Sequence, residues 1–224
     1  MRLASCTSFL FVATSVAAAQ GTSAASSART AYPAKPTPLA DSAEIALARS
    51  AAPDELSKDA AVYTVKDGRV ITLRAGTNGS SCMVARDYHP GSLYPICFNP
   101  EGTRTVLRRE LLQMKLRSLG VPEDSIDYAV AAAYTTGELE VPTTMALAYM
   151  MSPSQVLFSE ASKNGRRVGA WHPHLMFYVP GATPAKIGLA TASSGPISVS
   201  SAGTPQAELI VKLPQWADGT PVRD

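Results

Sequence analysis

The sequence predicts an α+β domain, in which a mainly antiparallel sheet carries an inserted helical hairpin and one disulfide. Short strand patterns joined by turn residues occupy the region from residue 62 to residue 84, a long helical stretch follows residue 99, and strand patterns return after residue 144. Strands on both sides of a single helical block argue against a doubly wound parallel sheet, in which strands and helices alternate. The span 41–218 is long enough for one domain with a substantial core.

The first 19 residues have the pattern of a secretory signal peptide. Arg2 precedes the apolar run LFVATSVAAA, whose small residues fit cleavage after Ala19. This run is too short to cross a membrane as a helix. Residues 20–40 are small, polar and proline-bearing, so we expect a disordered linker there. The sequence therefore predicts an exported protein, periplasmic or secreted, with no transmembrane span in the mature chain.

The charge balance limits the classes of partner. The whole chain carries a formal net charge of +2, and cleavage after Ala19 would remove Arg2 and leave about +1. A nearly neutral chain gives no argument for nucleic acid or an anionic membrane surface as the partner. We expect the partner to be an unidentified ligand or an envelope protein.

Cleavage would also remove Cys6 and leave two cysteines, Cys82 and Cys97. In an exported chain, one even pair is most simply explained by one disulfide. Closing a loop of about 14 residues should stabilise the fold by about 3 kcal/mol. A pair of free thiols is the alternative. The spacing differs from the C-x-x-C of zinc sites and dithiol redox motifs.

A short helix is predicted over residues 41–50. Asp41 and Ser42 are candidate N-caps, and Glu44 favours the helix N-terminus. The helix should end before Pro53, because a residue that precedes proline disfavours the helical conformation.

A β-hairpin is predicted next. Residues 62–65 and 70–73 have strand composition, and the turn Lys66–Arg69 contains an Asp-Gly pair. Asn78-Gly79 marks a second turn, and a third strand opens at Cys82.

The loop between the two cysteines is polar and aromatic. It contains Arg86, Asp87, Tyr88, His89 and Tyr94. Loops closed by a disulfide often carry recognition, so this loop is a candidate binding site, with a surface turn of no function as the alternative.

A helical hairpin is predicted over residues 99–139, with Gly120 and Pro122 between its helices. The residues expected to face the core are Leu107, Leu111 and Met114, with Leu112, Leu116 and Leu119 alongside, in the first helix, and Ile126, Val130 and Ala133 in the second. The residues expected on the solvent side of the first helix are Arg104, Arg108, Arg109, Lys115 and Arg117. A solvated basic face is the first interpretation, and an anion-binding surface is the alternative.

The last third of the chain returns to strand patterns. Residues 145–151 and 175–179 are short apolar runs of strand length, separated by a long connection over 152–171. One helical turn is expected in 183–190, and a closing hairpin is expected over 196–213.

His172 and His174 lie on either side of Pro173, which biases the first of them towards an extended backbone. Side chains two apart in an extended chain point to the same face, so both could bind one zinc or copper ion. His89 would have to supply a third ligand. The alternative is that His174 is a hydrogen-bonded residue at the start of a strand, while His172 lies in a loop.

Three stretches of the chain resemble an uncharacterised family of exported bacterial proteins. These are RAGTNGSSCMV, YPICFNPEG and PHLMFYVP, which match a G-T-N-G-x-x-C turn, a second cysteine and a late P-H-x-M strand. The matching positions are Gly76, Asn78, Gly79, Cys82, Cys97 and His174. The resemblance implies export and a disulfide-bearing α+β domain, and it implies no reaction.

No motif of a serine hydrolase, a dinucleotide enzyme or a P-loop enzyme is present in the sequence. We therefore predict a non-catalytic binding or envelope-associated module that needs no cofactor. Its candidate binding residues are Arg86, Asp87, Tyr88, His89, His172 and His174. The alternatives are a metal-dependent enzyme that uses His89, His172 and His174, and a purely structural envelope protein.

Overall fold

A computed structural model describes residues 39–86, 92–156 and 171–222. The strands in these residues are β1 (Ala61–Lys66), β2 (Arg69–Arg74), β3 (Ser81–Ala85), β4 (Tyr94–Phe98), β5 (Ala146–Met150), β6 (His174–Tyr178), β7 (Ser193–Ser194), β8 (Ile197–Ser200) and β9 (Glu208–Lys212). The helices are α1 (Asp41–Arg49), α2 (Asp54–Ser57), α3 (Pro100–Arg104), α4 (Val106–Ser118) and α5 (Glu123–Thr136), with a 3-10 turn at Ala185–Ile187.

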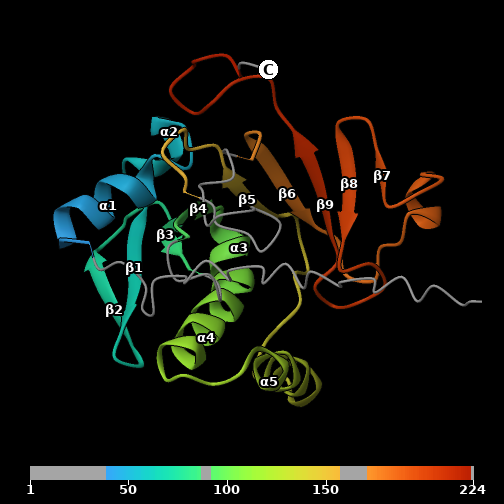
Figure 1. The fold of residues 1–224 in the computed structure, drawn as a ribbon, viewed down its shortest axis with the longest axis horizontal. Helices are drawn as coiled ribbons and strands as arrows, with labels where there is room; N and C mark the ends of the chain where they lie inside the picture. Colours follow the sequence, from blue (N-terminus) through green and yellow to red (C-terminus); the bar gives the residue numbers. More distant parts are fainter. Residues whose placement is uncertain (1–38, 87–91, 157–170, 223–224) are drawn as a thin grey trace, which may run out of the picture.

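The strands form one sheet in the order β2-β1-β3-β4-β5-β6-β9-β8-β7 (Figure 1). The pairing of β1 with β3 is parallel, and the other strand pairs are antiparallel. The predicted α+β class, with a mainly antiparallel sheet and an inserted helical block, is confirmed, and the block follows the fourth strand.

The ends of the chain are only partly described. The predicted signal peptide, 1–19, and all but the last two residues of the predicted linker, 20–40, lie outside the described residues. The predicted tail, 219–224, is described as far as Val222, whose N–H donates to Pro214 O at 2.9 Å. None of the helices in the described ranges is long and apolar enough to cross a membrane.

The predicted hairpin and the turn that follows it are both present. β1 and β2 pair around Asp67 and Gly68, which both have positive φ, as a tight Asp-Gly turn requires. Gly76 then passes very close to β1, because a Cβ on it would lie 2.1 Å from Ala61 N. The Asn78 side chain accepts from Ser80 N at 3.0 Å and so bends the chain into β3. This turn sets β3 beside β1 in the parallel direction.

The disulfide between Cys82 and Cys97 is confirmed, and it joins directly opposed residues of β3 and β4. Side chains of a strand alternate between the two faces of a sheet, so these cysteines share one face with Val84. Ala48 of α1 packs in the same cluster, and Cys97 Sγ lies 3.4 Å from Ala48 O. α1 therefore covers the disulfide face of the sheet.

α1 begins one residue earlier than its predicted caps imply. Asp41 and Ser42 are the first two helical residues, and Ala40 occupies the N-cap position without a side-chain hydrogen bond. The acidic first turn is as predicted, with Asp41 and Glu44. The short helix α2, which follows Pro53, was not predicted from the sequence.

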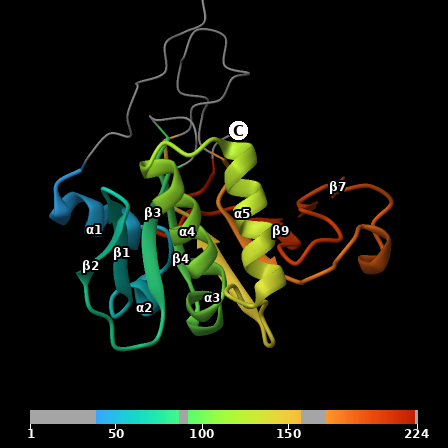
Figure 2. The ribbon, with the colours of Figure 1, turned by 90° about the horizontal axis from the view of Figure 1, so that it is seen from below.

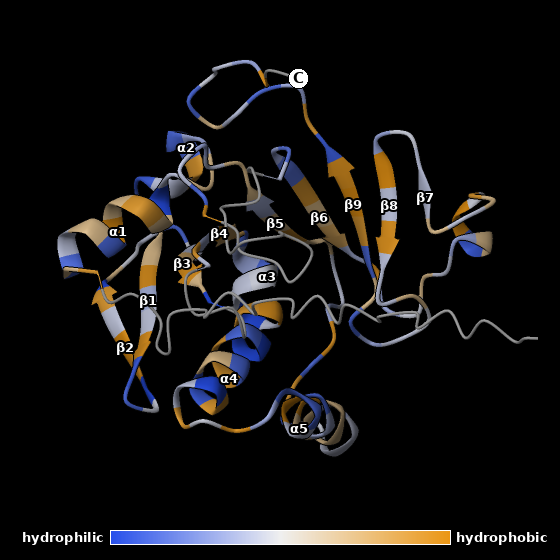
Figure 3. Ribbon diagram, viewed as in Figure 1, coloured by the Kyte–Doolittle hydropathy of each residue, from blue (hydrophilic) through white to orange (hydrophobic). Residues whose placement is uncertain are grey.

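The opposite face of the sheet is covered by the helical block. α3 and α4 are separated at Thr105, whose hydroxyl donates to Glu101 O at 2.7 Å. α4 packs on the sheet through residues such as Leu107 and Met114, and it packs on α5 through Leu112 and Leu116. Figure 2 shows α4 and α5 side by side, and Figure 3 shows hydrophilic and hydrophobic bands alternating along α4.

Two predictions for α4 are wrong. Leu119 is 58 % exposed rather than packed, because it follows the last turn of the helix. Arg109 was expected in solvent, but it is buried. It occupies the side of α4 that faces the sheet, where the sequence pattern alone could not distinguish a buried arginine from a solvated one.

The strands after the helices confirm the predicted arrangement. β5 and β6 correspond to the two apolar runs, and β8 and β9 form the closing hairpin. β9 inserts between β6 and β8, so that Tyr178 and Glu208 become direct neighbours.

Candidate functional site

A cavity of about 240 Å³ lies between α4 and the sheet. Its strand-borne lining residues are Ala85, Tyr94, Ile96, Met150, Met176, Tyr178 and Glu208. The remaining lining residues are Arg109, Glu110, Gln113 and Arg117 of α4, together with Arg86 and Trp171. The volume suits a ligand smaller than a typical drug molecule, whose pockets span roughly 300–1,000 Å³.

The cavity has an apolar floor, formed by strands, and a polar roof, formed by α4. Each follows from the side-chain periodicity of its element. On the floor, residues two apart along a strand face the same side, as Met176 and Tyr178 do on β6. On the roof, Arg109, Gln113 and Arg117 recur every four residues, which aligns them along one side of α4. A ligand in this cavity would therefore lie between an apolar surface and a row of polar side chains.

Arg109 is the buried centre of the polar roof. It forms an ion pair with Glu110, and its guanidinium lies over the Tyr178 ring, 5.4 Å from the centroid. Burial alone would lower the pKa of Arg109, but the charge of Glu110, with further contributions from Tyr178 and Glu208, raises it overall. Arg109 is therefore a permanent positive charge inside the domain.

Glu208 brings a carboxyl group to the floor of the cavity. Burial raises the pKa of Glu208, and the nearby charge of Arg109 offsets part of this rise. Its side chain hydrogen-bonds with Ser200 and Tyr178. Burial also raises the pKa of Tyr178 well above its usual value, so the phenol stays protonated and can donate a hydrogen bond.

Trp171 and Tyr94 form an aromatic pair at the edge of the cavity. Their rings are stacked, with centroids 5.4 Å apart, and Trp171 is 50 % exposed. Gln155 Nε2 donates to Trp171 O at 2.9 Å, and Leu93 forms a two-way backbone bridge with Val156. The long connection thus joins the disulfide loop at the place where the aromatic pair lies.

Two further arginines line the cavity and are held by carboxylates from flanking helices. Arg86 donates to both oxygens of Glu44 in α1, at 2.7 and 2.6 Å. Arg117 donates to both oxygens of Glu123 in α5, at 2.8 and 2.9 Å, and to Arg86 O at 3.3 Å. Arg86 and Arg117, which we call the rim of the cavity, are therefore preorganised by bidentate ion pairs. These pairs fix the orientation of the two guanidinium groups.

The six predicted binding residues are placed only in part. Arg86 lines the cavity, whereas Asp87, Tyr88 and His89 lie outside the described residues. His174 is buried at the start of β6, and its ring and that of Trp171 form a T-shaped pair with centroids 5.9 Å apart.

The structure brings His172 and His174 together through the backbone. His174 Nδ1 lies 2.8 Å from His172 O, so Nδ1 carries the proton and only Nε2 could bind a metal. Within the residues that the structure describes, no group of three His, Cys, Asp or Glu side chains could hold a metal ion. A site that includes His89 involves an undescribed residue, and so this alternative stays a prediction.

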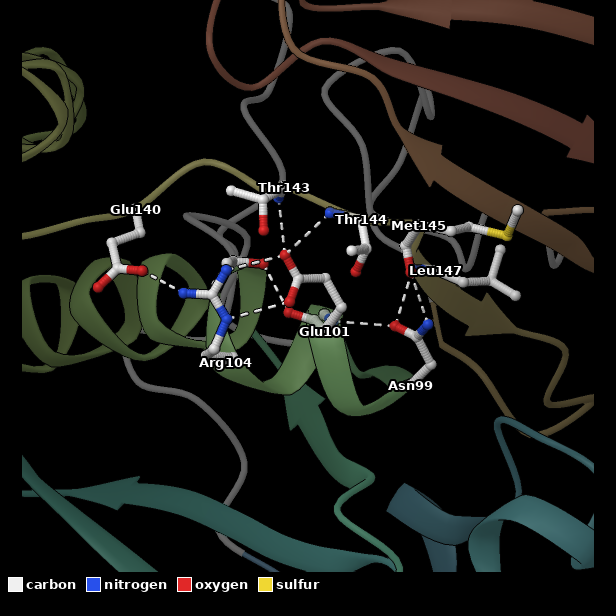
Figure 4. Close-up of polar contacts among 10 residues, drawn as sticks. Asn99, Glu101, Arg104, Glu140, Thr143, Thr144, Met145 and Leu147 are labelled. Carbon is white, nitrogen blue, oxygen red and sulfur yellow. Dashed lines mark hydrogen bonds and ion pairs between the residues drawn. The ribbon is translucent and has the colours of Figure 1, made fainter.

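A second polar cluster joins α3 to the start of β5 (Figure 4). Glu101 accepts from Nε and Nη2 of Arg104, at 3.0 and 2.9 Å, and from Thr143 N at 2.8 Å. The hydrogen bond from Arg104, with support from Thr143, lowers the pKa of Glu101 to about 2. Asn99 caps α3 at Gly102 N and also accepts from Leu147 N. These hydrogen bonds fasten the loop before β5, so the cluster has a structural role.

Most of the cavity was missed in the sequence. A polar row at helical spacing is present in the sequence, formed by Arg109, Glu110, Gln113 and Arg117. It could have indicated a polar face of α4 distinct from the core side and the solvent side. Glu208 precedes three apolar residues in β9, but only the insertion of β9 beside β6 brings it to the other lining residues. Tyr94 was named only as a loop residue, and Trp171 only as the end of a connection.

A scan against protein-family models found no match, and searches of the curated proteins and of the solved structures found none either.

Proposed function

We propose that this chain is an exported module that binds a small molecule in the cavity between α4 and the sheet. The observation that carries the proposal is the composition of the cavity lining. The cavity unites Arg86 from the disulfide loop, Trp171 from the end of the long connection and the polar row of α4. Of these, only Arg86 was among the binding residues predicted from the sequence. Polar groups that converge over an apolar floor are typical of small-molecule sites.

Export is part of the proposal and rests on two observations. The first 19 residues have the composition of a signal peptide, and Cys82 and Cys97 form a disulfide. A disulfide persists in an oxidising compartment, which agrees with the periplasm or the cell exterior.

Trp171 offers a direct way to test binding. The chain has two tryptophans, so W216F leaves Trp171 as the only one. We expect amphipathic probes such as 2-phenylethanol, phenethylamine and 3-phenylpropionate, titrated into the W216F protein, to shift or quench its fluorescence. At least one of the three should saturate at millimolar concentration or below.

A pair of matched variants shows whether the probes bind in the cavity. A85F places a ring on the cavity side of β3, whereas A131F places it on the exposed side of α5. Binding should be lost in A85F and retained in A131F, with circular dichroism to show that both fold. If A85F unfolds, Q113F fills the cavity from the roof instead. Equal binding by the cavity-filled variant and by A131F would contradict the proposal.

A further inference from the structure

Counted together, the charged lining residues and their ion-pair partners are three arginines and four glutamates, so the formal excess is one negative charge. Each arginine in the lining has an ion-pair partner: Arg86 with Glu44, Arg109 with Glu110, and Arg117 with Glu123. Glu44 and Glu123 lie outside the lining, and their charges neutralise those of the rim residues Arg86 and Arg117. These pairs therefore leave no arginine with an uncompensated charge for an anionic ligand.

Glu208 is the lining carboxyl group that remains. Among the ion pairs of the described ranges, none includes Glu208. Its hydrogen-bond partners, Ser200 and Tyr178, are neutral side chains. Arg109, already paired with Glu110, also acts on Glu208. When Glu208 is ionised, the two carboxylates therefore share one cation, and one net negative charge remains beside the floor of the cavity, where low dielectric strengthens its field.

The aromatic residues of the lining also favour a positively charged ligand. The faces of tryptophan and tyrosine rings attract cations, and Arg109 over Tyr178 shows this contact inside the cavity. The stacked pair of Trp171 and Tyr94 adds aromatic surface at the edge, and Trp171 is half-exposed. The apolar floor of Ile96, Met150 and Met176 would accept a hydrocarbon group.

We propose that the cavity binds a small organic cation, an amine or quaternary ammonium with a short apolar or aromatic group. The inference rests on the proposed function and adds the class of ligand. The ammonium group faces the Glu208 carboxylate, and the apolar group lies on the floor against Met150 and Met176. An anionic ligand of the same shape would meet the carboxylate of Glu208 and would have to displace Glu110 from Arg109.

Three probes of nearly equal shape test the sign of the charge. Phenethylamine is cationic at about pH 8, 2-phenylethanol is neutral, and 3-phenylpropionate is anionic. We expect phenethylamine to bind the W216F protein ~10-fold more tightly than either of the others, by Trp171 fluorescence and by calorimetry. E208Q should remove this preference, while the affinity for 2-phenylethanol stays within about two-fold.

E138Q is the matched control, because Glu138 is an exposed carboxylate outside the cavity lining. It should leave all three affinities unchanged. E208Q is nearly isosteric, and a thermal unfolding curve shows whether it folds. If it does not fold, E208D, which keeps the charge, should retain the preference for the amine.

The outcomes separate this inference from the proposed function. Tighter binding of the alcohol or the carboxylate, with loss in A85F, would overturn the cationic ligand but leave the cavity as a binding site. Retention of the amine preference by E208Q would also overturn the inference. Failure of all three probes to bind would overturn both.

Discussion

The guanidinium of Arg109 lies over the ring of Tyr178, 5.4 Å from its centroid, so that a helix and a strand meet through a buried charge. Glu110 and Glu208 contribute to the raised pKa of Arg109. A buried cation with nearby carboxyl groups is costly to disturb, because removing one member leaves the others without compensation. A change at Arg109 should therefore alter both the stability of the domain and the distribution of charge in its cavity.

R109M should destabilise the protein by about 3 kcal/mol at neutral pH, because Glu110 and Glu208 lose their shared cation. Burial already raises the pKa of Glu208, with Arg109 acting against the rise, so the pKa of Glu208 should rise further in the variant. A carboxyl group whose pKa is raised by folding costs stability as the pH increases through that pKa. The loss in R109M should consequently be smaller near pH 5 than near pH 8, as urea unfolding would measure.

R108M is the control for this prediction, since Arg108 is exposed on the same helix. It should change stability by less than about 0.5 kcal/mol. An equal loss in R109M at both pH values would show that Glu208 does not interact with Arg109 as described.

E101Q should destabilise the protein by about 1 kcal/mol at neutral pH, a value discounted because Arg104 is partly exposed. Arg104 and Thr143 lower the pKa of Glu101 from 4.5 to about 2. The stabilisation is thus present above pH 4.5 and is lost as the pH falls from there towards 2. The difference between wild type and E101Q should shrink over this window in urea unfolding. A difference that persists below it, or an equal effect of E55Q at the exposed Glu55, would contradict the account.

G76A should destabilise the protein by more than about 2 kcal/mol, because the added Cβ meets backbone atoms that cannot rotate away. The nearest are Ala61 N at 2.1 Å and Ala60 C at 2.6 Å. G120A is the comparison, since a Cβ on Gly120 would meet nothing within 4 Å. Its cost, about 1 kcal/mol, should come only from its positive φ. Thermal unfolding that ranked G120A as the more damaging change would refute the close approach.

The double variant C82A/C97A should lose about 3 kcal/mol of stability, as expected for opening a loop of this length. Both cysteines are fully buried beneath α1, so reduction of the wild-type disulfide should require unfolding. Thiol labelling after mild reductant should therefore accelerate with urea in parallel with unfolding. Rapid labelling of the native protein without denaturant would argue against this burial.

The order of elements could be predicted from the sequence because it depends on local patterns. The Asp67-Gly68 turn, the apolar runs of β5 and β6 and the stop at Gly120 are properties of neighbouring residues. The disulfide could be predicted as well, since loss of Cys6 with the predicted signal peptide would leave two cysteines and one possible pairing.

The cavity could not be predicted in the same way, because its charges come from elements that are distant in the chain. Arg109 was assigned to solvent from its place among other basic residues, and only the packing of α4 on the sheet shows that it is buried. His174 Nδ1 lies 2.8 Å from His172 O, a contact between a side chain and the backbone that the spacing of the two histidines did not predict.

The sequence by itself determined the α+β class, the strands of the two hairpins and the disulfide, because turn chemistry and side-chain periodicity act over a few residues. Only the tertiary structure decided that β9 inserts beside β6 and that α4 turns a polar row towards the sheet. The physical reason is that burial and ion pairing depend on the summed packing of remote segments. That packing places Arg109, Tyr178 and Glu208 around one cavity.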